Sequence, residues 1–100
     1  MQVSNRTILV TGGGSGIGRG LAEAFHKLGN KVIIAGRRQR KLDETTNANP
    51  GIESMTFNVT DAADIRRFAA SVTKRFPALD VLVNNAGIMQ AEDLTEPDVS

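Results

Sequence analysis

A glycine-rich tract at residues 12–18 constrains the fold of this chain more than any other feature. Five of these seven residues are glycine, and the tract follows the apolar run Ile8-Leu9-Val10. An amphipathic segment begins immediately after it, near Ile17. The pattern predicts a buried strand, a glycine turn and a helix, in that order.

Such a turn is suited to binding an anion. Glycine has no Cβ, so the backbone can adopt positive φ and a ligand can approach the main chain closely. A helix that begins at the turn directs its unpaired N–H groups, and the positive end of its dipole, toward the same space. A merely flexible loop is the alternative, but the flanking strand and helix favour a phosphate or pyrophosphate site.

Composition and charge exclude several other kinds of protein. The chain has 100 residues, enough for one domain, and its 40% hydrophobic and 23% charged residues are typical of globular proteins. A net charge of +1 argues against nucleic acid or an anionic membrane as a partner. No cysteine and a single histidine exclude a disulfide framework, a thiol nucleophile and a multi-histidine metal site. Without a signal peptide or an apolar run of about 20 residues, we expect a cytoplasmic protein.

Apolar periodicity predicts strands and helices in alternation along the rest of the chain. The expected strands cover residues 7–11, 32–35, 52–57 and 79–83. The first expected helix carries an apolar stripe of Ile17, Leu21, Phe25 and Leu28, the second covers residues 37–46, and the third follows a cap at Thr60-Asp61 with a stripe of Ile65, Phe68, Ala69, Val72 and Phe76.

This alternation predicts an α/β fold, the N-terminal part of a Rossmann-type doubly wound parallel sheet with three helices. Right-handed crossovers place the first two helices on one face and the third on the other, which gives strand order 3-2-1-4. The reversal lies between the first and fourth strands, so a ligand is expected at their carboxyl ends. Both the glycine turn and Asn84-Asn85-Ala86-Gly87 follow those ends.

The fourth strand poses a problem for a complete protein. Its run Val81-Leu82-Val83 would form a sheet edge without a protecting charge or proline. We therefore expect residues 1–100 to be a truncated dinucleotide-binding domain, the N-terminal part of a longer protein, unless a partner completes the sheet.

Three nucleotide-binding patterns can be compared with the glycine turn. The P-loop spacing is met by Gly13 and Gly18, but Arg19-Gly20 stand where its lysine and hydroxyl residue belong. The G-x-G-x-x-G pattern fails because position 17 is isoleucine. The pattern that fits is T-G-x-x-x-G-x-G, formed by Thr11, Gly12, Gly16 and Gly18.

Together, Thr11–Gly18, Asn58-Val59-Thr60-Asp61 and Asn84–Gly87 resemble the short-chain dehydrogenase/reductase family over residues 5–89. Within it, residues 7–18 and 28–34 are similar to oxidoreductases encoded alongside D-alanylation genes in Gram-positive bacteria. The resemblance implies a turn at Gly12, pyrophosphate and nicotinamide contacts near Ser15 and Ile17, an adenine border at Asn58-Val59, and Asn84 bracing the sheet. With the two arginines that the charge pattern indicates below, the full set of expected cofactor-binding residues is Gly12, Gly14, Ser15, Gly16, Ile17, Gly18, Arg37, Arg38, Asn58, Val59, Asn85, Ala86 and Gly87.

The residues after the second strand favour NADP(H) over NAD(H). NAD-binding folds place an acidic residue there for the ribose 2′-hydroxyl, but this position is Gly36. Arg37, Arg38, Arg40 and Lys41 follow at the start of a helix, where positive charge opposes the dipole and a 2′-phosphate would compensate it. A solvated cluster relieved by nearby carboxylates is the alternative.

The family's catalytic Ser and Tyr-x-x-x-Lys are not found here, since the chain has no tyrosine and its serines lie elsewhere. The resemblance implies a parent enzyme, usually a homo-oligomer, that transfers hydride to or from a small carbonyl or alcohol substrate. The alternative is a non-catalytic NADP(H)-binding sensor or scaffold. A continuation carrying those residues would indicate the enzyme, and an early stop codon would indicate the sensor.

Overall fold

The computed structural model describes residues 4–14, 16–57 and 62–85. Strands and helices alternate throughout these residues, as the sequence predicts. In chain order they are β1 (Thr7–Thr11), α1 (Gly16–Lys27), β2 (Lys31–Gly36), α2 (Gln39–Ala48), β3 (Glu53–Thr56), α3 (Ala62–Arg75) and β4 (Val81–Val83).

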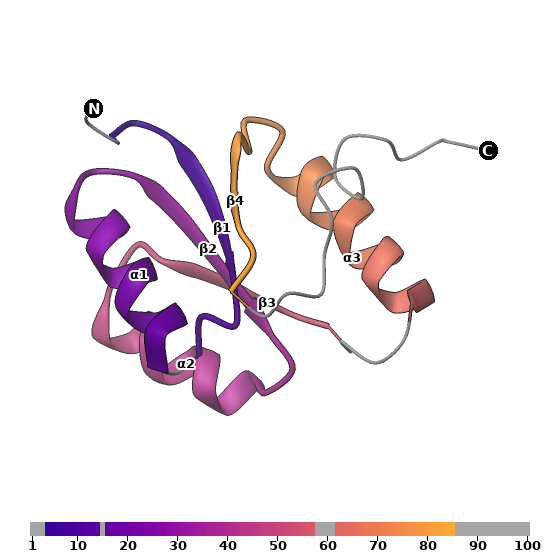
Figure 1. Ribbon diagram of the computed structural model, residues 1–100, viewed down its shortest axis with the longest axis horizontal. Coiled ribbons are helices and arrows are strands. Elements are labelled where there is room, and N and C mark those ends of the chain that lie inside the picture. Colours follow the sequence, from indigo (N-terminus) through magenta and orange to yellow (C-terminus); the bar gives the residue numbers. More distant parts are fainter. Residues whose placement is uncertain (1–3, 15, 58–61, 86–100) are drawn as a thin grey trace.

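The four strands form one parallel sheet in the order β3-β2-β1-β4, which confirms the predicted topology (Figure 1). β1 is central: Ile8 pairs with Val32 of β2 on one side and with Val81 of β4 on the other. Because all four strands run the same way, the turns that follow β1 and β2 meet at one edge of the sheet.

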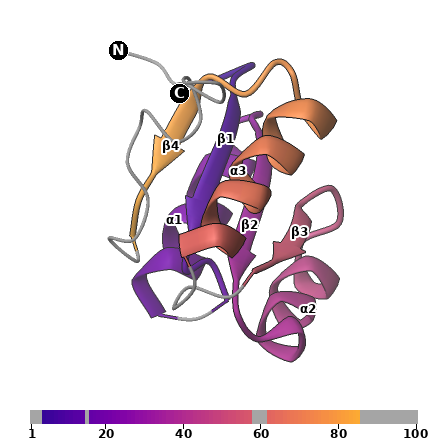
Figure 2. The ribbon, with the colours of Figure 1, turned by 90° about the vertical axis from the view of Figure 1, so that its right-hand side faces the viewer.

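Helices cover both faces of the sheet: α1 and α2 pack on one face, and α3 packs on the other (Figure 2). Side chains alternate along β1 between the two cores. The core under α1 and α2 is formed by Ile8, Val10, Ala22, Val32, Ile34, Leu42 and Ile52. The core under α3 is formed by Leu9, Ile33, Ala35, Phe57, Phe68, Ala69 and Val72.

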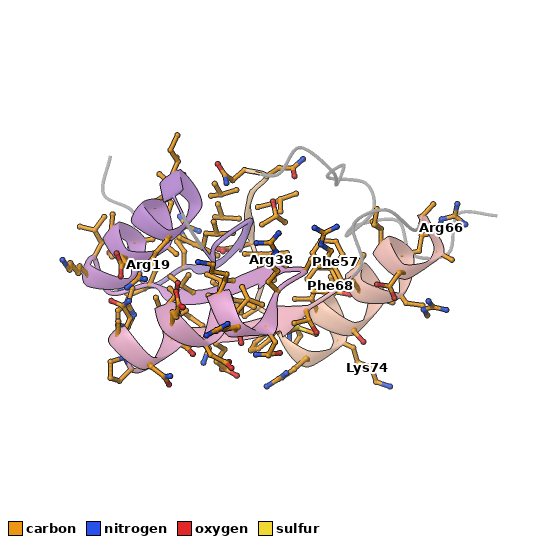
Figure 3. All side chains as sticks on the ribbon, turned by 90° about the horizontal axis from the view of Figure 1, so that it is seen from below. Arg19, Arg38, Phe57, Arg66, Phe68 and Lys74 are labelled. Atoms are coloured by element: carbon orange, nitrogen blue, oxygen red, sulfur yellow. The ribbon has the colours of Figure 1, made fainter. Side chains whose placement is uncertain are left out.

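Two aromatic rings anchor α3 against the sheet. Phe57, directly after β3, stacks on Phe68 of α3 with ring centroids 4.3 Å apart and an interplanar angle of 14° (Figure 3). Both side chains are buried, at 6% and 4% exposure. This contact belongs to the predicted α3 stripe, and it fixes the helix over the carboxyl end of β3.

The predicted apolar stripe of α1 is wrong at both ends. Ile17 is 76% exposed and Leu28, which lies just beyond the helix, is 57% exposed. The buried residues of α1 are instead Gly18 and Ala22. Such small residues allow the helix axis to approach the sheet closely, and Leu21 and Phe25 are only half buried beside them.

Several boundaries also differ from prediction. α2 begins at Gln39 instead of 37, because Arg37 and Arg38 form the connection and Arg38 keeps an extended backbone (φ −103°, ψ 104°). The third and fourth strands are shorter than expected, at Glu53–Thr56 and Val81–Val83. The predicted cap at residues 60–61 lies outside the described residues.

Candidate functional site

A pocket of about 330 Å³ opens at the carboxyl ends of β1 and β2. Its size lies within the range of small-molecule sites. The turn after β1 and the segment that leads from β2 into α2 form its walls. The described lining residues are Gly12, Gly14, Gly36, Arg37, Arg38, Lys41 and Leu42.

The glycine turn has a backbone that other residues could adopt only with strain. Gly12 has φ of 72° and Gly16 has φ of 59°. The N–H of Gly12 donates to the carbonyl oxygen of Ala35 at 2.7 Å, which joins the start of the turn to β2. Positive φ and close backbone approach are therefore required at this turn, as its composition predicts.

Gly18 is required for a different reason, namely space. A Cβ at this position would overlap the carbonyl oxygen of Gly12, and would lie 2.7 Å from the Gly12 carbonyl carbon and 2.8 Å from Nδ2 of Asn85. Backbone cannot move aside as a flexible side chain can. The first turn of α1 is thus packed directly on the glycine turn, with Asn85 reaching it from beyond β4.

α2 packs on the same turn from the other side. A Cβ at Gly13 would lie 2.5 Å from Cγ2 of Ile34, and a Cβ at Gly14 would lie 2.9 Å from Cβ of Lys41. The buried hydroxyl of Thr45 donates to the carbonyl oxygen of Gly13 at 3.3 Å. Gly13 therefore makes room for Ile34 of β2, and Gly14 makes room for α2.

The end of β4 is joined to β1 through Thr11. The buried Oγ1 of Thr11 lies 3.3 Å from Oδ1 of Asn84 and 3.4 Å from the carbonyl oxygen of Val83. Asn84 thus contacts the sheet in the bracing position that the sequence predicts.

The electrostatics of the pocket are positive. Arg37, Arg38 and Lys41 line it, no carboxylate belongs to its described lining, and none of the three forms an ion pair with another described residue. The first turn of α2 contains no acidic residue, and its N-cap residue Arg38 makes no side-chain capping bond. The helix therefore presents its positive end together with three cationic side chains.

The carboxylates with shifted pKa values lie away from this pocket. Asn49 Nδ2, at 2.7 Å, and Arg19 Nε, at 3.2 Å, hold the pKa of Glu23 below its ordinary value. Lys31 does the same to the pKa of Glu53, with a smaller contribution from Arg75. Both groups fasten helices and strands together, and neither is placed for acid–base chemistry at the pocket.

The structure brings together most of the predicted site residues that it describes. Gly12, Gly14, Arg37 and Arg38 line the pocket, whereas Gly16, Ile17, Gly18 and Asn85 belong to or contact the turn without lining it. Ser15, Asn58, Val59, Ala86 and Gly87 lie outside the described residues. Gly36, Lys41 and Leu42 complete the lining but were not predicted as site residues, although the sequence shows Lys41 among the cations that follow the second strand.

Within residues 4–14, 16–57 and 62–85, no three side chains of His, Cys, Asp or Glu converge as a metal-binding group. None of the helices described is both long enough and apolar enough to cross a membrane.

A doubly wound parallel sheet, with a glycine turn beside a cationic pocket at its carboxyl edge, defines a nucleotide-binding α/β protein. The family model for short chain dehydrogenases matches residues 6–100. The chain belongs to the short-chain dehydrogenase/reductase family.

Relatives and solved structures agree with this assignment. The chain is 41% identical over 93 residues to the uncharacterized oxidoreductase DltE of Bacillus subtilis, covering 93% of this chain and 37% of that protein. The citronellol catabolism dehydrogenase AtuB of Pseudomonas aeruginosa superposes with a TM-score of 0.77 at 28% identity, covering 89% of this chain and 41% of the other. The NADP complex of Pseudomonas aeruginosa RhlG gives a TM-score of 0.75 at 30% identity, covering 84% and 35%.

Similarity to DltE agrees with the narrower resemblance noted in residues 7–18 and 28–34. The chain spans 37% of the length of DltE, and 29% and 44% of the length of two other curated relatives.

Proposed function

We propose that this chain is the cofactor-binding portion of an NADP(H)-dependent oxidoreductase that interconverts a carbonyl and an alcohol. When bound, the nicotinamide would supply or accept the hydride. The residues described here would hold and orient the cofactor, and the substrate would be a small molecule.

One observation carries the choice of NADP(H): the end of β2 combines Gly36 with Arg37 and Arg38 at the wall of the pocket. A carboxylate at position 36 would accept a hydrogen bond from a ribose 2′-hydroxyl, and this chain has none there. The two arginines offer planar, permanently charged donor groups that match a phosphate. RhlG, whose NADP complex has a similar fold, supports the same reading.

Features near the pocket also favour the pyrophosphate of a dinucleotide. The absence of a Cβ at Gly12 and Gly14 lets an anionic ligand approach the main chain along one wall. The nearby start of α1 supplies N–H groups and a positive dipole end, which favour a pyrophosphate. The exposed Ile17 gives this turn an apolar side chain that the core does not use.

The resemblance to the family implies a tyrosine for the proton transfer that accompanies hydride transfer, and residues 1–100 contain no tyrosine. The second candidate is a non-catalytic NADP(H)-binding sensor. The two are separated by assaying the protein, expressed in full from its own gene, with NADPH and a panel of small aldehydes and ketones. Carbonyl-dependent NADPH oxidation indicates the enzyme, and tight binding without turnover indicates the sensor.

The cofactor preference is tested by replacing both arginines, Arg37→Asp with Arg38→Ala, and measuring binding by calorimetry. Charge-assisted hydrogen bonds contribute about 1.5–3 kcal/mol each, so NADPH affinity is expected to fall at least about tenfold. NADH affinity is expected to change less than about threefold, because NADH carries no 2′-phosphate.

A matched control makes the same charge change on the opposite face of the sheet, Arg66→Asp with Lys74→Ala. Both side chains are exposed on α3 and point away from the sheet (Figure 3). This control is expected to bind NADPH as the wild type does. Equal losses of NADPH and NADH affinity in the arginine variant would refute the proposal.

A further inference from the structure

We propose that Lys41 is a third residue that determines specificity for the phosphorylated cofactor, acting from α2 together with Arg37 and Arg38. This inference rests on the proposed function and extends it to a residue that the family motifs do not single out. It is carried by the position of Lys41 in the pocket wall, by its contact with the glycine turn and by a charge that no carboxylate among the described residues pairs with.

The first line of evidence is the face of α2 on which Lys41 lies. Within α2, Thr45 lies four residues after Lys41 and three residues after Leu42, which places all three on one side of the helix. Leu42 is buried and lines the pocket, and Thr45 is buried and bonded to the glycine turn. Lys41 therefore emerges on the side of α2 that faces the turn.

A second line of evidence is the closeness of its stem to the turn. A Cβ added at Gly14 would lie only 2.9 Å from the Cβ of Lys41 and 3.4 Å from the carbonyl carbon of Lys41. Only glycine at position 14 permits this approach. The first atoms of the Lys41 side chain are thus held against the backbone that we propose receives the cofactor.

A third line of evidence is charge. Lys41 is exposed and forms no ion pair with any carboxylate of the described residues. It is the third residue of α2, where a cation is unfavourable with respect to the helix dipole. A ligand phosphate in the pocket would relieve this repulsion, and it would do so for Lys41 and both arginines together.

Neighbouring Arg40 supplies a matched comparison. It carries the same charge, lies in the same turn of α2 and is likewise exposed, but it does not line the pocket. A general effect of net charge would act equally through Arg40 and Lys41, whereas a direct contact would act through Lys41 alone.

The experiment measures NADPH and NADH binding by calorimetry for the wild type, Lys41→Gln and Arg40→Gln, with the protein expressed in full. Glutamine keeps the stem that packs near Gly14 and removes the charge. We expect Lys41→Gln to weaken NADPH binding by about three- to tenfold, as for one partly exposed charge-assisted contact, and to leave NADH binding within about twofold. The conservative variant Lys41→Arg, which keeps the charge, is expected to retain most of the wild-type NADPH affinity.

Three outcomes would overturn the inference: unchanged NADPH affinity in Lys41→Gln, an equal loss in Arg40→Gln, or equal losses for NADPH and NADH. Failure of the proposed function has a different signature, because the wild type itself would then bind NADPH no better than NADH. If the wild type prefers NADPH and Lys41→Gln keeps the same preference, the role of Lys41 is refuted while the proposed function stands.

Discussion

Gly18 and Gly20 lie two residues apart in α1, and alanine at each is expected to change stability in opposite directions. A Cβ at Gly18 would overlap the backbone of Gly12, whereas a Cβ at Gly20 meets nothing within 4 Å. Both positions are inside a helix, so alanine brings the same gain in helix propensity, about 1 kcal/mol. The difference between the two variants therefore isolates the steric contact.

The magnitude follows from these contacts. Overpacking costs about 1–3 kcal/mol, and the upper end applies because the opposing atoms at Gly18 are main chain and cannot change rotamer. After the propensity gain, Gly18→Ala should lose about 2 kcal/mol, while Gly20→Ala should gain about 1. With a urea slope of about 1.5 kcal/mol per M for a chain of this size, the two midpoints should differ by about 2 M.

Urea unfolding followed by circular dichroism measures the stability difference, and calorimetric titration with NADPH measures its effect on binding. Because the clash displaces the Gly12 carbonyl, Gly18→Ala is expected to weaken NADPH binding by at least about tenfold, and Gly20→Ala to leave it within about twofold. Equal unfolding midpoints for the two variants would show that the turn relaxes without cost, and would refute the steric argument.

Two further perturbations test contacts around the site. Thr45→Val keeps the side-chain shape but removes the buried hydrogen bond to the Gly13 carbonyl, so the free energy of unfolding should fall by about 1–2 kcal/mol. Thr45→Ser, which keeps the hydroxyl, should lose less stability, and an unchanged urea midpoint for Thr45→Val would contradict this. The pKa of Glu53 is lowered in the folded protein, chiefly by Lys31. The ionised carboxylate therefore stabilises the fold above about pH 5, and this contribution is lost as the pH falls through the pKa that Glu53 has in the folded state. The stability gap between wild type and Glu53→Gln should therefore be largest at pH 7 and close toward pH 3, and a gap independent of pH would exclude the ion pair as its source.

The sheet was predictable because its two inner strands, β1 and β2, are apolar on both faces. Ile8, Leu9 and Val10 are all fully buried, as a central parallel strand requires, and right-handed crossovers then leave one strand order. The apolar pattern of the strands and the right-handed crossovers predict the same sheet, and the observed strand order agrees with it.

The packing of α1 was not predictable in the same way. Large apolar residues marked a stripe through Ile17 and Leu28, but the helix packs through Gly18 and Ala22, which contribute little to a hydrophobic pattern. How closely a helix approaches a sheet is a tertiary property.

For the candidate site, the glycine turn and the arginines could be recognised from residue type and position. The contribution of Lys41 to the lining depends on α2 beginning at Gln39, because this boundary sets which face of the helix meets the turn. Thr45 escaped notice for a related reason, since a threonine within a helix gives no sign of a partner 32 residues away.

The strand order also has a consequence for the sequence of folding events. The pocket wall joins residues 12–14 to residues 36–42, and only α1 and β2 lie between these two segments along the chain. Forming the wall therefore closes a short loop. By contrast, Thr11 meets Asn84 across a separation of 73 residues, and closing a longer loop costs more entropy. We expect the cationic wall to form early, even during synthesis on the ribosome, and the contact between Asn85 and Gly18 to form late. Variants at β4 should consequently change unfolding rates more than folding rates.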